Sequence, residues 1–220
     1  YLSPLAACAL LCTAASGSAP AVASLVRADT GEGALARDLH VPVSGKAALK
    51  AVTSANKVLN AALGNAEVDF GAKHTPHVTL YLSRFSCPNG AAGTPEPCEE
   101  RLTDDLNSNV HTTFGLDVCE VEISAPYASG SYAMAAVRLD DCLQKLSDGV
   151  VNSTYTEAEP DQPPPAWVMS LPEPERSEKL AMLAKYGSPN VFTQFAPHVT
   201  LGWANNTSLV ASAVARLKRE

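Results

Sequence analysis

The segment Pro76-His77-Val78-Thr79-Leu80 occurs a second time in the chain, as Pro197-His198-Val199-Thr200-Leu201. The two copies are identical over five residues and lie 121 residues apart. In a β-strand, residues i and i+2 point to the same side, so each copy places histidine and threonine on one face. Valine and leucine then lie on the opposite, apolar face. The repeat predicts two equivalent strands, and an α+β fold in which two related halves meet about a pseudo-two-fold axis.

Two opposed His/Thr pairs suit the opening of a phosphodiester. One imidazole takes a proton from the attacking oxygen, and the other donates a proton to the departing oxygen. Threonine hydroxyls donate hydrogen bonds to the non-bridging phosphate oxygens. The candidate catalytic residues are therefore His77 and His198, the candidate phosphate-binding residues are Thr79 and Thr200, and this chemistry needs no metal.

These motifs resemble those of the 2H (two-histidine) phosphoesterase superfamily, in which two His-x-Ser/Thr motifs are flanked by hydrophobic residues. The stretch Phe195-Ala196-Pro197-His198-Val199-Thr200-Leu201 is similar to the family's second motif, and 76–80 is similar to the first. The resemblance spans about 39–217. It implies a bilobal α+β fold, with antiparallel sheets lining a central cleft and helices on the outside. It also implies action without cofactors on 2′,3′-cyclic phosphates, 2′-5′-linked oligonucleotides or RNA ends.

Aromatic residues follow both motifs. Tyr81 continues the alternation of His77 and Thr79, so it either stacks on a nucleotide base or packs in the core. Trp203 is out of phase with its motif, and we expect it in the core.

The remaining histidines carry weaker signals. His74 precedes His77 by three residues, which would suit a metal only with further ligands nearby. His40 and His111 are expected on the surface, and Lys73 is either a phosphate contact or an exposed lysine.

The composition limits the class of protein. The 220 residues are 46% hydrophobic, 18% charged and 6% aromatic, with a net charge of −7. These values fit a globular domain with a core and argue against a protein that neutralises long nucleic acid. We expect a monomer that acts on a small nucleotide or an RNA terminus.

The first 23 residues carry no charge, and Ala21-Val22-Ala23 resembles a signal-peptide cleavage site. We therefore interpret 1–23 as a signal peptide with a fragmentary start, 24–38 as a linker, and 39–220 as one domain. The prediction is a secreted or lumenal protein without a membrane span. The alternative is a cytoplasmic protein with an Ala-rich tail.

Four cysteines follow the proposed signal peptide, and they allow three disulfide connectivities. We favour Cys87–Cys98 and Cys119–Cys142, while four free thiols are the alternative. Sequons at Asn152, Asn205 and Asn206 would accept glycans only in the secretory pathway.

The pattern of apolar residues predicts alternating strands and helices. Strands are expected over 39–43, 77–85, 114–124, 131–139 and 198–203. Helices are expected from a cap at Ser44 to an end at Gly64, across 102–110, from a cap at Asp140 or Asp141, over 176–186 and over 209–217. A turn is expected around Pro126 and Gly130. The proline-rich stretch 159–175 is predicted to be an insertion in which 167–169 dock locally.

Two other functions remain open from the sequence. The first is a non-catalytic module that binds a nucleotide or a phosphorylated ligand. The second is a metal-dependent hydrolase that uses His74, His77 and His198.

Overall fold

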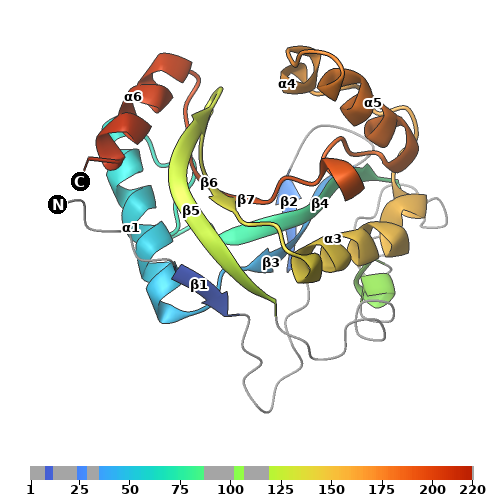
Figure 1. Ribbon diagram of the computed structural model, residues 1–220, viewed down its shortest axis with the longest axis horizontal. Helices are drawn as coiled ribbons and strands as arrows, with labels where there is room; N and C mark the ends of the chain where they lie inside the picture. Colours follow the sequence, from blue (N-terminus) through green and yellow to red (C-terminus); the bar gives the residue numbers. More distant parts are fainter. Residues whose placement is uncertain (1–7, 12–23, 29–34, 87–101, 107–118, 220) are drawn as a thin grey trace.

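The computed structural model describes residues 8–11, 24–28, 35–86, 102–106 and 119–219. The fold is α+β, as the sequence predicts, with two antiparallel sheets and several helices (Figure 1). The strands are β1 (Cys8–Leu11), β2 (Ser24–Ala28), β3 (Leu35–Pro42), β4 (His77–Phe85), β5 (Glu120–Ser129), β6 (Tyr132–Val137) and β7 (His198–Trp203). The helices are α1 (Lys46–Leu63), a short helix over 102–106, α3 (Asp141–Thr154), α4 (Ala166–Met169), α5 (Glu175–Tyr186) and α6 (Thr207–Leu217), with 3₁₀ turns η1 (Tyr155–Glu157) and η2 (Phe192–Gln194).

The two repeated segments occupy edge strands of different sheets. One sheet has the strand order β1-β5-β6-β7, and the other has the order β2-β3-β4. Each repeat pairs antiparallel with its inner neighbour, β4 with β3 and β7 with β6. The edge strands β4 and β7 also contact one another, so the topology brings the two motif strands together.

Helices α1 and α3 each pack on the sheet other than the one that holds the strand before them in the chain. Helix α1 follows β3 in the chain but packs on β7 and on α6, and α6 contacts β5 and β6. Helix α3 follows β6 but packs on β4. Figure 1 shows α1 and α6 together on one side of the molecule and α3, α4 and α5 on the other. Gly202 lies where α1 approaches β7 closely, since an added Cβ would lie 3.2 Å from the Leu63 side chain.

The apolar residues of both repeats form the centre of the core. Val78 and Val199 are completely buried, and Leu80 and Leu201 are each 1% exposed. Complete burial of such side chains contributes about 1.5–3 kcal/mol each to folding. The same five residues that carry the His/Thr pairs therefore also anchor their strands.

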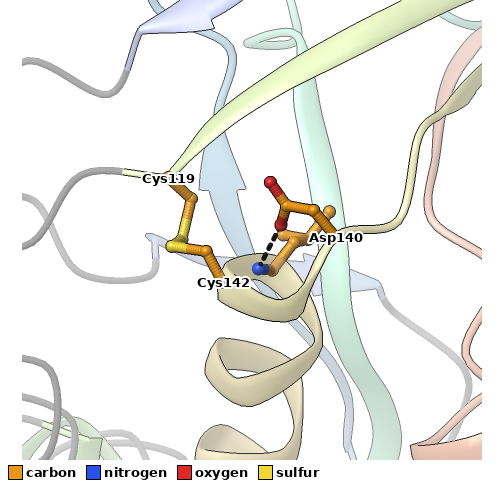
Figure 2. Close-up of a disulfide and its surroundings, with 4 residues drawn as sticks. Cys119, Asp140 and Cys142 are labelled. Atoms are coloured by element: carbon orange, nitrogen blue, oxygen red, sulfur yellow. Dashed lines mark hydrogen bonds between the residues drawn. A yellow bond between two sulfur atoms is a disulfide. The ribbon is translucent and has the colours of Figure 1, made fainter.

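The predicted Cys119–Cys142 disulfide is confirmed (Figure 2), with a Cα–Cα distance of 5.5 Å. It joins the residue before β5 to the first turn of α3. Of the two expected caps, Asp140 caps this helix, because its Oδ1 accepts a hydrogen bond of 2.8 Å from the Leu143 amide. Cys87 and Cys98 lie outside the described residues.

Strands occur in the stretch that we expected to be a linker. Strand β3 begins at Leu35 rather than Leu39, and it pairs with β2, which lies within 24–38. Strand β1 lies within the interpreted signal peptide and pairs with β5. Strand β3 carries charged residues among its apolar ones. The alternation of apolar residues therefore does not reveal its full length, because backbone pairing does not require such alternation.

Several turn signals differ from the prediction. Pro126 lies inside β5, at a register shift, and the turn itself falls at Gly130, whose φ of 56° suits glycine. Gly45 rather than Ser44 is the N-cap of α1, whereas Gly64 ends this helix in the left-handed conformation, as predicted.

The proline-rich insertion contains the short helix α4. Val168 is completely buried, whereas Trp167 and Met169 are 47% and 49% exposed. The local docking predicted for 167–169 therefore rests on the valine. None of the helices in the described ranges has the length and apolar character that a membrane crossing needs.

Candidate functional site

The His/Thr pairs lie at matched places on the two motif strands. His77 and Thr79 on β4, and His198 and Thr200 on β7, are all partly buried, while the residues between them are fully buried. The proline before each histidine is buried as well, and its carbonyl accepts a hydrogen bond from the neighbouring segment. Val43 donates to Pro76 at 2.8 Å, and Val137 donates to Pro197 at 3.0 Å.

A β-bulge interrupts each motif at the same residue. On β4 the register passes from Thr79 to Tyr81 and skips Leu80, and on β7 it passes from Thr200 to Gly202 and skips Leu201. A bulge sets two residues against one on the partner strand and re-aims the side chains that follow. The two strands therefore share a local distortion as well as a sequence.

Both histidines are anchored in the same way. His77 Nδ1 lies 2.7 Å from the Thr75 carbonyl oxygen, and His198 Nδ1 lies 3.0 Å from the Ala196 carbonyl oxygen. A carbonyl only accepts hydrogen bonds, so Nδ1 carries the proton in each ring. Each imidazole therefore has Nε2 as its remaining nitrogen for a further contact.

The surroundings of Nε2 distinguish the two motifs. His77 Nε2 lies 3.1 Å from Asp38 Oδ2, and the Thr79 hydroxyl donates to the same oxygen at 3.0 Å. Asp38 comes from β3, which pairs with β4. In the described part of the chain, no carboxylate makes an ion pair with His198, and the Thr200 side chain has no hydrogen-bond partner.

The contact between Asp38 and His77 shifts the pKa of both groups. Burial raises the pKa of the Asp38 carboxyl, but the adjacent His40 and His77 imidazoles outweigh burial and lower it to about 2. Burial lowers the pKa of His77, but Asp38 and then the Thr75 carbonyl outweigh it, so the net pKa is raised. The lowered pKa of Asp38 and the raised pKa of His77 both favour an ion pair between the two side chains.

The expectation that His40 lies on the surface is wrong. Its side chain is 1% exposed, and its ring stacks on His77 with centroids 4.1 Å apart and planes inclined by 29°. Because Asp38 and His40 are two residues apart on β3, both point to the face that His77 and Thr79 share.

Tyr81 is buried, with 1% of its surface exposed. Its hydroxyl donates to the Tyr186 carbonyl at 2.5 Å, and its ring meets Phe85 edge-to-face with centroids 5.5 Å apart. Burial raises the pKa of this phenol to about 12. The bulge at Leu80 turns Tyr81 away from the His77 face, which agrees with the packing alternative. Trp203 is partly buried.

Within the described residues, His74 belongs to no group of potential metal ligands. Its Nδ1 accepts a hydrogen bond of 3.1 Å from the Asp69 amide, and Lys73 beside it is exposed. Among the described residues, the group able to hold a metal ion is Asp38, His40 and His77, whose ligand atoms all lie within 4.8 Å of one another. His111 lies outside the described residues.

Asp38 is the site residue that sequence reasoning missed. The i, i+2 spacing of Asp38 and His40 was the available signal, but it becomes visible only when the strand is extended back to Leu35. Neither a scan against models of known protein families nor a search of curated proteins found a match to this chain.

Proposed function

We propose that this protein is a phosphodiesterase that hydrolyses 2′,3′-cyclic phosphates or related nucleotide and RNA-end diesters by two-histidine catalysis. The observation that carries the proposal is the matched anchoring of His77 and His198. In both, Nδ1 is bound to the carbonyl two residues earlier, so that Nε2 is presented on the face of the following threonine. The contact between β4 and β7 supports a single site built from both motifs.

The hydrogen bonds around the rings support different roles for the two histidines. His77 has an acceptor at each nitrogen, so it holds a proton on both and suits the general acid. His198 in its neutral form keeps a lone pair on Nε2 and suits the general base. Water attacks phosphorus as its proton passes to His198 Nε2. The bond from phosphorus to one ribose oxygen breaks, and that oxygen takes the proton from His77 Nε2.

The threonines bind the charge that phosphate carries throughout the reaction. Thr200 lies two residues after His198, where its hydroxyl donates to a non-bridging oxygen. Thr79 holds the same place after His77, but its hydroxyl donates to Asp38 and reaches a non-bridging oxygen only after it leaves that carboxylate. The scheme uses no metal or other cofactor. The net charge of −7 favours a small substrate over a long polyanion. We further propose a bilobal monomer that works in the secretory pathway or outside the cell.

The proposal is tested with a panel of substrates. The full chain is incubated with 2′,3′-cyclic mononucleotides and with short 2′-5′ and 3′-5′ oligonucleotides, each with and without EDTA, and the products are separated by chromatography. We expect turnover of the cyclic phosphate that EDTA does not remove. Activity that EDTA abolishes, or no turnover of any substrate, would contradict the proposal.

A non-catalytic binding module is the second candidate, and Asp38 is the observation that favours it. Its carboxylate oxygen already accepts hydrogen bonds from His77 and Thr79, the two groups that would otherwise contact phosphate in this motif. Binding of nucleotides by calorimetry without turnover of any substrate in the panel would favour this candidate.

A further inference from the structure

The polar cluster formed by Asp38, His40 and His77 has properties beyond acid/base catalysis. It lies on the paired strands β3 and β4, and one ligand atom from each residue lies within 4.8 Å of the others. Asp38 directs one oxygen towards each imidazole, at 3.1 Å from His77 Nε2 and at 3.5 Å from His40 Nδ1. Ligand atoms on a tetrahedral zinc ion are about 3.4 Å apart, from bond lengths of about 2.1 Å.

Two buried atoms of the cluster lack a hydrogen bond. Within the residues that the structure describes, Asp38 Oδ1 and His40 Nδ1 are both buried without a hydrogen-bond partner. Their separation of 3.5 Å is too long for a well-formed hydrogen bond. Buried polar atoms are nearly always paired, and an ion bound between these two atoms would satisfy both.

The surroundings of His77 also suit a metal ligand. Histidines that bind metals usually donate their second ring N–H to a carbonyl or carboxylate, which fixes the ring and its tautomer. The Thr75 carbonyl, 2.7 Å from His77 Nδ1, occupies this position and leaves Nε2 for an ion.

We propose that Asp38, His40 and His77 form a binding site for a divalent transition-metal ion of the Zn²⁺ class. Two imidazole nitrogens and one carboxylate favour such ions over Mg²⁺ or Ca²⁺, which prefer oxygen ligands. The ion displaces the proton on His77 Nε2. Since that nitrogen is the proton donor in the proposed reaction, metal binding inhibits turnover. This second effect rests on the proposed function, whereas the metal site itself does not.

Binding is tested on the full chain after removal of metal with EDTA and dialysis. Co²⁺ is titrated as the probe, its visible absorption is recorded, and Zn²⁺ is then added in competition. We expect one site per chain, with an affinity at least about tenfold weaker in Asp38→Asn and in His40→Gln. The control variants His198→Ala and His74→Ala should bind like the wild type.

Circular dichroism shows whether each ligand variant folds. If one of the two variants does not fold, the other still tests the site. Unchanged Co²⁺ affinity in a folded Asp38→Asn or His40→Gln variant would overturn the metal site, as would loss of binding in His198→Ala.

Inhibition is measured separately, on the turnover of a 2′,3′-cyclic mononucleotide. We expect saturating Zn²⁺ to reduce turnover at least tenfold and EDTA to restore it. In His40→Gln, the Zn²⁺ concentration that halves turnover should rise at least about tenfold. Zn²⁺ that binds without slowing turnover would overturn the inhibitory role. If no substrate turns over at all, the proposed function fails, and the Co²⁺ titration alone decides the metal site.

Discussion

The two motif strands, β4 and β7, share a scaffold but differ in what surrounds the reactive nitrogen. In both, the proline is buried, the histidine Nδ1 is bound to the carbonyl two residues earlier, and the leucine forms a bulge. On β4, however, Asp38 binds the histidine and the threonine, whereas no described carboxylate pairs with His198 on β7. The repeated sequence therefore sets the buried strand and the Nδ1 contact, whereas the neighbouring strand sets the surroundings of Nε2.

The cause of the difference lies in the inner strands. Strand β3 places Asp38 and His40 on the face shared with His77, whereas β6 sets Met134 and Ala136 opposite Thr200 and His198. These apolar neighbours place no charged side chain beside the second motif. Two copies of one motif therefore have different electrostatic surroundings, which suits a reaction with one acid and one base.

The shared scaffold gives the largest expected effect. Leu80→Ala and Leu201→Ala should each lower the free energy of unfolding by about 2–5 kcal/mol, because each removes a buried side chain at the bulge. Leu82→Ala on β4, where the side chain is 48% exposed, is the matched control and should change stability by less than about 0.5 kcal/mol. Chemical denaturation measures all three. A large loss of stability in only one of the two leucine variants would show that the two strands are not equivalent.

The two threonines of the motifs should contribute unequally to kcat/KM. Thr200→Val should lower kcat/KM for a cyclic phosphate by about a hundredfold, because its hydroxyl is available to the substrate. Thr79→Val should cost about tenfold or less, since its single proton already bonds Asp38. Steady-state kinetics of the two variants decides between them. A larger loss at Thr79 would mean that Asp38 releases this hydroxyl when substrate binds.

The Asp38–His77 pair should make stability depend on pH, with the smallest effect of the three. A carboxyl pKa lowered from 3.8 to about 2 contributes about 2 kcal/mol above pH 3.8, and this is lost as pH falls towards 2. The raised pKa of His77 stabilises the fold below pH 6.5, and this contribution is lost as pH rises through the folded-state value. The pair thus stabilises the fold most between about pH 4 and 6.5.

The pH dependence is measured by thermal or chemical unfolding in EDTA, so that metal binding does not contribute. Asp38→Asn should flatten both limbs of the stability profile. Glu120→Gln, at an exposed position of β5, is the control and should leave the profile unchanged. A wild-type profile that is level from pH 2 to 8 would contradict the ion pair.

The two motif strands and the ends of two helices could be predicted from the sequence. His77–Phe85 and His198–Trp203 were predicted with the bounds that the strands have, because strict alternation around a buried valine and leucine identifies both. Asp140 and Gly64 marked helix ends because their roles are set by local backbone chemistry.

The rest depended on tertiary pairing. Asp38 lies in a strand segment of mixed polarity, and only its pairing with β4 shows that it reaches His77. His40 carries no pattern of its own, and its burial follows from stacking on a residue 37 positions away. Tyr81 left the predicted face because of a bulge, which strict alternation does not anticipate.

The two motifs are proposed to form one catalytic site, which is tested most directly by the turnover of a 2′,3′-cyclic mononucleotide by matched histidine variants. His77→Ala and His198→Ala should each lower kcat by about 10²–10⁴-fold with an unchanged circular dichroism spectrum, while His74→Ala keeps wild-type activity. Near wild-type turnover in either motif variant would show that the two motifs do not form one catalytic site.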